Sequence, residues 1–228
     1  MSNSFKPPER VFNALDNKKL NLFTPCPGAP EKTSALIWGI TKDNNPRITV
    51  YTNDPTDTGA DKGYGKIDAK LDMPVFFAFL QLLNNITNHS GEIKEKIENT
   101  NYTFPNGKRS EKPTVVSELW VGKEKDGVVW MSVTANNRPR IKFNFAPSSF
   151  HRFMHADGTP FTPGETSKLF ALGHISILEK MMVHVAVNTY VKPEPKNQQG
   201  GNNWSNNNRS NNGGNSGSSN IDSQDLPF

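Results

Sequence analysis

The chain has 228 residues, 34% of them hydrophobic, and carries a formal net charge of +4, which fits one large domain better than two small ones. Its single cysteine, Cys26, excludes an intrachain disulfide and a zinc site built on several thiolates. The longest apolar stretch, residues 75–83, is too short to span a bilayer and no signal peptide precedes it, so a soluble cytoplasmic protein is expected.

The first half of the chain predicts an arm, a hairpin and a helix. Residues 1–33 are rich in proline and predict an extended N-terminal arm. Apolar residues alternate through residues 34–53 on both sides of a turn, which indicates a β-hairpin. Residues 54–72 are expected to form a polar loop, and a helix begins at Met73 with apolar residues at helical spacing.

The second half predicts more strands and another helix. Strands are expected over 93–104, 115–122, 128–135 and 140–145. Residues 166–189 predict a helix, although the β-branched stretch 183–191 leaves a strand open. About six short strands with an inserted helix and a C-terminal helix indicate a mainly β, α+β domain over 34–191. Its expected architecture is a small antiparallel barrel of OB-fold type.

The tail separates into a tether and a tip. Residues 192–220 are expected to be a disordered linker of glycine, asparagine and serine, in which Trp204 is the only large apolar side chain after Lys196. Nothing in this segment could bury Phe228. We therefore expect residues 221–228 to bind a basic, hydrophobic pocket on a partner, or a basic groove of the same chain, through Asp222, Asp225, Leu226, Pro227 and Phe228.

The charge of the folded part favours a polyanionic partner. After Lys196 the charged residues are Arg209, Asp222 and Asp225, and removing one positive and two negative charges from +4 leaves +5. An excess of this size is equally consistent with ordinary solubilising charge.

Strand alternation places cations and aromatic rings on the outward faces of the expected barrel. Rings stack on bases and cations pair with phosphates, so this pattern is typical of a groove for single strands. The arm or the C-terminal helix could instead cover these side chains. Trp38 is expected in the core, and Trp120 could lie on either face. The candidates for binding single-stranded DNA are Arg47, Tyr51, Tyr64, Lys66, Lys94, Lys96, Tyr102, Trp130, Arg138, Arg140 and Lys142.

Signals for catalysis are weak. His151 and His155 have the spacing of a zinc-binding helix but lack the glutamate base between them. The aspartates of residues 54–72 match no calcium loop. We therefore expect no catalytic residues, no metal and no cofactor, with a metal-dependent nuclease that uses these aspartates as the alternative.

The barrel, the tether containing Gln198–Gln199–Gly200–Gly201 and the end Asp225–Leu226–Pro227–Phe228 together resemble single-stranded DNA-binding proteins. The bacterial proteins end in an acidic run followed by Ile-Pro-Phe, and Leu226 stands here for the isoleucine. The size and the inserted helix look more like phage-encoded members of the T7 type, which would act in the host cytoplasm.

The resemblance implies a non-catalytic protein that coats single-stranded DNA. Phe228 would enter a pocket on replication, recombination or repair proteins, with Pro227 shaping the tip and Asp225 contacting a basic rim. An RNA-binding or chaperone module is a further alternative. The oligomeric state, monomer or dimer, stays open, and no membrane partner is expected.

Overall fold

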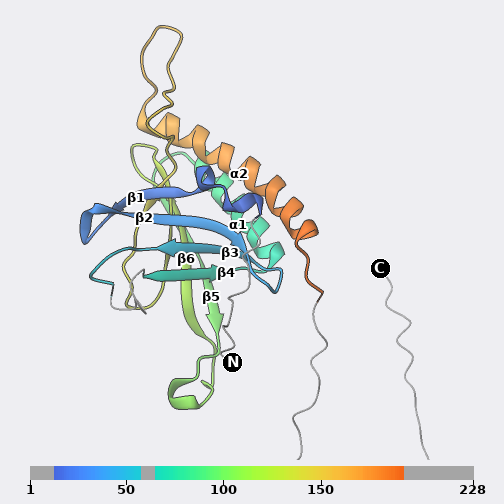
Figure 1. Ribbon diagram of the computed structural model, residues 1–228. Coiled ribbons are helices and arrows are strands. Elements are labelled where there is room, and N and C mark those ends of the chain that lie inside the picture. Colours follow the sequence, from blue (N-terminus) through green and yellow to red (C-terminus); the bar gives the residue numbers. More distant parts are fainter. Residues whose placement is uncertain (1–12, 58–64, 193–228) are drawn as a thin grey trace, which may run out of the picture. The chain divides into compact units, whose positions relative to one another are not determined.

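Two antiparallel four-stranded sheets form the frame of the computed structural model, which describes residues 13–57 and 65–192 (Figure 1). In each sheet the strands lie side by side in chain order. The first sheet contains β1 (Leu22–Cys26), β2 (Ala29–Ile40), β3 (Pro46–Tyr51) and β4 (Lys66–Lys70). The second contains β5 (Ile93–Asn101), β6 (Thr114–Lys123), β7 (Val129–Thr134) and β8 (Phe143–Asn144).

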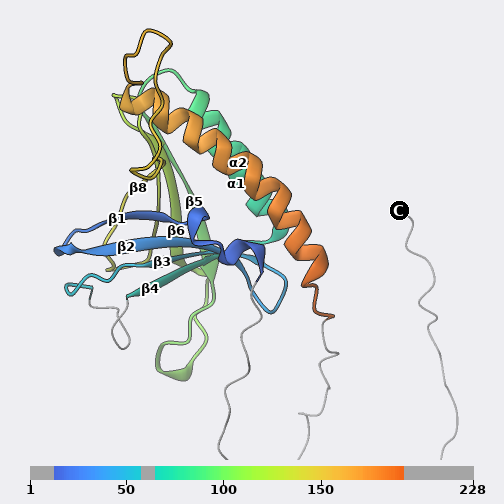
Figure 2. The same cartoon turned by 45° about the horizontal axis from the view of Figure 1, so that its top comes forward.

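Two long helices pack against each other along one side of the sheets (Figure 2). Helix α1 (Met73–Asn88) connects the sheets, and helix α2 (Pro163–Asn188) follows the second sheet. Proline occupies the first turn of each, where its missing N–H is not needed. Thr162 and Glu165 close a capping box at the start of α2. Short 3₁₀ turns complete the list of elements: η1 (Ala14–Asp16), η2 (Lys18–Leu20) and η3 (Pro105–Gly107).

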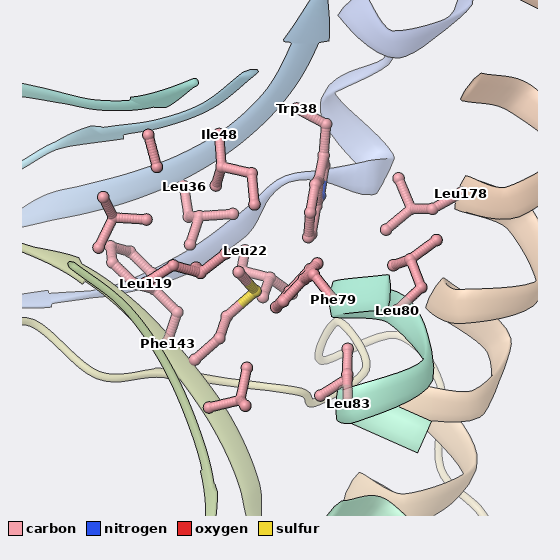
Figure 3. Close-up of a cluster of buried hydrophobic side chains, with 14 of the residues drawn as sticks. Leu22, Leu36, Trp38, Ile48, Phe79, Leu80, Leu83, Leu119, Phe143 and Leu178 are labelled. Atoms are coloured by element: carbon pink, nitrogen blue, oxygen red, sulfur yellow. The ribbon is translucent and has the colours of Figure 1, made fainter. Parts of the chain in front are cut away.

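The core lies where the inner faces of both sheets meet the helices (Figure 3). Trp38 is 2% exposed, and its indole Nε1 donates a hydrogen bond to the carbonyl of Leu20 (3.0 Å). Its ring meets that of Phe76 edge-on at 6.5 Å. The predicted burial of Trp38 is therefore confirmed. Figure 3 shows Leu22, Leu36, Ile48, Phe79, Leu80, Leu83, Leu119, Phe143 and Leu178 around it.

The predicted hairpin and both helices are confirmed, and residues 183–188 belong to α2 rather than to a strand. Two strands were missed. Strand β1 and the start of β2 lie within residues 22–33, which were expected to be an arm, and β4 lies in the expected polar loop. Strand β1 is an edge strand that contains Pro25, and β4 has only Ile67 and Ala69 on its inner face. Of the strand expected over 140–145, only Phe143–Asn144 (β8) pairs with the sheet.

The structure is an α+β fold, as expected. Strand β1 lies beside β8, so the sheets meet there edge to edge, whereas β4, the other edge of the first sheet, lies beside the inner strands β6 and β7 of the second. The strand pairing nevertheless leaves them as two separate sheets among the described residues.

Helix α2 is apolar enough and long enough to cross a membrane, contrary to the expectation that no segment is. About 33% of its most apolar window is buried in the fold, where Leu178 and Met182 are fully covered. Length and composition alone are weak evidence for a membrane span, because core helices of soluble proteins share them.

The buried histidine of α2 makes stability depend on pH. His174 is 5% exposed between the rings of Phe145 and Phe170, and burial lowers its pKa from the usual 6.5. Below that pH the unfolded chain takes up a proton that the folded chain resists, so the free energy of unfolding falls as the pH decreases. We expect His174→Gln to flatten this fall in urea titrations between about pH 5 and 7. An unchanged pH slope would contradict the assignment.

Candidate nucleic-acid interface

The predicted binding residues divide between the outer faces of the two sheets. Arg47, Tyr51 and Lys66 lie on the first sheet, and Lys94, Lys96 and Trp130 lie on the second. Arg138, Arg140 and Lys142 lie between β7 and β8, and Tyr102 follows β5. Tyr64 and the tip residues Asp222, Asp225, Leu226, Pro227 and Phe228 lie outside the described residues.

The second sheet carries the denser set of rings and cations. Its register aligns Lys96 with Trp120 and Ser132, and Lys94 with Gly122 and Trp130, all on the outer face. Arg140 and Lys142 reach the same face from the segment after β7. We call this surface the tryptophan face, made of Lys94, Lys96, Glu98, Glu118, Trp120, Trp130, Arg140 and Lys142.

Trp120 is the half-buried ring of this face. The guanidinium carbon of Arg140 lies 4.1 Å from its ring centre, and Lys96 Nζ lies 5.2 Å away. Its indole Nε1 donates a hydrogen bond to Glu118 (2.9 Å), which fixes the plane of the ring. The sequence left Trp120 between core and surface, and the register places it outside because Leu119 and Val121 point inward.

Trp130 points outward, as predicted, but it is covered and only 4% exposed. Its ring lies across Gly122 on the neighbouring strand, where a β-carbon would come within 2.5 Å of it. Lys142 Nζ lies 4.6 Å from the ring centre on the tryptophan face. The expectation that Trp130 is an exposed aromatic ring is therefore wrong: without a side chain at position 122, the indole packs against the neighbouring strand.

Glutamates hold the cations of the tryptophan face. Lys96 pairs with Glu118 (2.7 Å) and Glu98, and Lys142 pairs with Glu124. Arg140 makes a looser pair with Glu118 at 3.7 Å. The hydrogen bonds from Lys96 and Trp120 lower the pKa of Glu118, and that of Lys96 is raised mainly by Glu118. The face is thus a network of opposite charges with one aromatic ring beneath it.

The hairpin between β5 and β6, residues 102–113, extends this surface beyond the sheet (Figure 1). The guanidinium carbon of Arg109 lies 3.6 Å from the ring centre of Tyr102. Phe104 is 64% exposed, and Lys108 and Lys112 are exposed nearby. Phe104 and Arg109 were missed as candidates, although their position in a turn next to Tyr102 was the available signal.

A pocket of about 640 Å³ lies between the start of β6 and the turn after β7, beside Glu118 and Arg140 of the tryptophan face. Val115 at the base of the hairpin and Glu118 on β6 form one wall. The turn after β7 forms the other wall with Asn136, Asn137 and Arg140. Its lining is mostly polar, with amide, carboxylate and guanidinium groups.

Arg138 lines this pocket, but its guanidinium is engaged in an ion pair within the chain. It makes a bidentate ion pair with Asp57, with Nη2 at 2.7 Å from Oδ2, and the two side chains are 13% and 0% exposed. Thr52 also donates to Asp57 (2.7 Å), and Arg138 Nη2 contacts the carbonyl of Lys66 (3.4 Å). Arg138, a predicted DNA-binding residue, is thus paired within the fold, where its charge joins the turn after β7 to the segment after β3.

The outer face of the first sheet carries fewer aromatic rings and cations than that of the second. Lys66 pairs with Asp68 (2.8 Å), and Thr49 donates to the same carboxylate (2.6 Å). Burial raises the pKa of Asp68, but these hydrogen bonds outweigh it and lower the pKa. Arg47 and Tyr51 are half-buried on this sheet.

The remaining candidates for chemistry have structural surroundings. Hydrogen bonds from the hydroxyl and amide of Thr56, and then from the amide of Gly28, lower the pKa of Asp54. Asp61 lies outside the described residues. His155 stacks on Phe161 at 4.2 Å between ring centres. Residues 13–57 and 65–192 hold no group of three or more His, Cys, Asp or Glu arranged for a metal ion.

Comparisons of the chain with protein-family models, curated proteins and solved structures find no match.

Proposed function

We propose that this chain binds single-stranded DNA without sequence preference, through the tryptophan face and the hairpin of residues 102–113. The observation that carries the proposal is the half-buried ring of Trp120 with Arg140 at 4.1 Å and Lys96 at 5.2 Å. Every base has a face that stacks on such a ring, and phosphates pair with the cations around it. The protein is not an enzyme in this proposal.

The glutamates of the tryptophan face are compatible with phosphate binding. Glu118 and Glu98 hold Lys96 at the surface, where an ion pair contributes only about 0–1 kcal/mol. A DNA phosphate can therefore replace a carboxylate at small cost. Arg140 can keep its planar stacking on Trp120 or on a base while its N–H groups turn to a phosphate.

The hairpin supplies further stacking platforms along the same surface. Tyr102 and Phe104 are both exposed, and Arg109, Lys108 and Lys112 surround them. The pocket of about 640 Å³ begins at Thr114 and Val115, next to the hairpin in the chain, and reaches Glu118 and Arg140 of the tryptophan face. A strand that crosses the face would thus meet a ring at each end of the path.

The proposal also includes the barrel architecture and a role for the C-terminal residues 221–228. Two antiparallel sheets that meet edge to edge at β1 and β8, with β4 beside β6 and β7 and a helix between the sheets in the chain, support a barrel of OB-fold type. We propose that residues 221–228 recruit replication, recombination or repair proteins, with Phe228 as the anchor and Asp225 beside it. The terminal resemblance to phage-encoded single-stranded DNA-binding proteins supports this assignment.

The test is a titration of the full chain with fluorescent oligonucleotides at several salt concentrations. We expect single strands of different sequence to bind alike, the affinity to fall with salt, and tryptophan fluorescence to be quenched. A version ending at Lys196 should bind DNA equally well or better, because the acidic tip no longer competes. The same titration with RNA oligonucleotides measures the preference for DNA, and incubation of a labelled strand with Mg²⁺ tests for cleavage.

Three results would contradict the proposal: duplex DNA bound as tightly as single strands at moderate salt, RNA preferred over DNA, or cleavage of the strand with Mg²⁺. Loss of DNA affinity in the version ending at Lys196, with partner binding intact, would reverse the roles of face and tip.

A further inference from the structure

Helix α2 exposes apolar side chains on the face turned away from the core. Leu169, Ile177 and Val183 are 44%, 43% and 51% exposed. A helix at the surface of a monomer normally carries polar residues on this side. Apolar surface arranged along one element marks an interaction site.

Gly173 lies within this exposed face. A glycine in the middle of a helix costs about 0.5–1 kcal/mol relative to alanine. Its β-carbon would meet no atom within 4 Å, so packing within the chain gives no reason for a glycine here. A missing side chain lets a second backbone approach closely at this point.

Two more apolar clusters lie at the ends of α2. Before its first turn, a finger of residues 148–161 projects beyond the helix, with Phe150 85% and Met154 49% exposed (Figure 1). A bridge between Met154 and Pro160 holds the finger together. At the other end, Val187 and Tyr190 are 73% and 62% exposed.

We propose that two copies of this chain associate through α2, with the helices antiparallel and the two-fold axis at Gly173. This arrangement brings Leu169 of one copy level with Ile177 of the other. It also brings the finger of each copy to the C-terminal end of the other copy's α2. A single symmetric contact thereby covers all the apolar clusters, as expected of an isologous interface.

The charges of α2 favour the antiparallel pairing with a second copy. Glu165 and Lys180 lie eight and seven residues from Gly173 on opposite sides. With a rise of about 1.5 Å per residue, they become level with each other across the pair. Lys168 and Glu179, five and six residues from Gly173, become level in the same way, although Glu179 also accepts a hydrogen bond from Gln81 of α1 (3.1 Å). A parallel pair would instead place like charges together.

A lipid bilayer fits this face less well. Lys180 is exposed near the middle of α2, and Glu179 precedes it. A charged residue at the centre of a membrane-spanning helix costs about 2.5–3.5 kcal/mol. In a pair of copies the same charges are neutralised by the opposite charges of the second helix.

The first experiment is analytical ultracentrifugation of the full chain over a range of concentrations. We expect a dimer at micromolar concentration, and Gly173→Arg should raise its dissociation constant by about a hundredfold or more. The fold should survive, because nothing within the chain occupies that space. Asn85→Arg, the same change at an exposed position of α1, is the matched control and should leave association unchanged.

A charge exchange tests the identity of the partner. Lys180→Glu should raise the dissociation constant about tenfold at low salt, since two symmetric ion pairs are lost. Adding Glu165→Lys should restore it, with circular dichroism confirming that α2 survives the loss of its capping carboxylate. A monomer at every concentration would overturn the proposal, as would a dimer indifferent to Gly173→Arg, no rescue in the double variant, or binding of the chain to phosphatidylcholine vesicles through α2.

Discussion

Arg138→Ala is expected to lower the free energy of unfolding by about 3–5 kcal/mol. The substitution leaves the Asp57 carboxylate, 0% exposed, without the guanidinium that pairs with it. Thr52 still donates a hydrogen bond to Asp57, but a neutral hydroxyl does not replace the charge of a bidentate guanidinium. Urea denaturation followed by circular dichroism measures the loss.

The neighbouring arginine provides a matched control. Arg140 is 46% exposed and lies 3.7 Å from Glu118, so Arg140→Ala should change stability by less than about 1 kcal/mol. In a double-mutant cycle, Asp57→Ala combined with Arg138→Ala should cost less than the sum of the single changes. Equal effects of the two arginine substitutions would show that the buried pair does not hold the sheets together.

The strands that the sequence predicted well are those with strong alternation. Residues 36–40 of β2 and strand β3 show apolar residues on every second position, and Trp38 falls in the core as that pattern requires. Strand β4 has the same alternation but only Ile67 and Ala69 to reveal it. Its place in the sheet depends on pairing with β3, and pairing between distant residues leaves no local signal.

In the candidate site, too, local alternation was predicted correctly and contacts between distant residues were not. Alternation assigned Lys94, Lys96 and Trp130 to the outer face, and the register agrees. Alternation gives the direction of a side chain but not what covers it. The cover over Trp130 depends on Gly122 across the strand pair, and the partner of Arg138 lies 81 residues away. Such contacts become visible only when the chain is folded.

In the proposed function, stacking of bases on the tryptophan face depends most on Trp120, because Trp130 is buried and cannot stack on a base. In the proposed binding mode, one base stacks at Trp120 while Arg140 and Lys96 meet the flanking phosphates. Stacking and charge therefore make separate contributions, which different measurements can distinguish: substitution of the ring changes affinity at all salt concentrations, and substitution of a cation changes the salt dependence.

Trp120→Ala is accordingly expected to weaken binding of single-stranded DNA by about ten- to a hundredfold, the value of about 1–3 kcal/mol for one stacked base. Trp120→Phe keeps an aromatic ring and should lose much less. Arg140→Ala should reduce the slope of log affinity against log salt concentration by about one, whereas Trp120→Ala should leave that slope unchanged. Fluorescence anisotropy with a labelled oligonucleotide measures both quantities. If Trp120→Ala bound normally while Tyr51→Ala on the first sheet lost affinity, the strand would follow the first sheet instead.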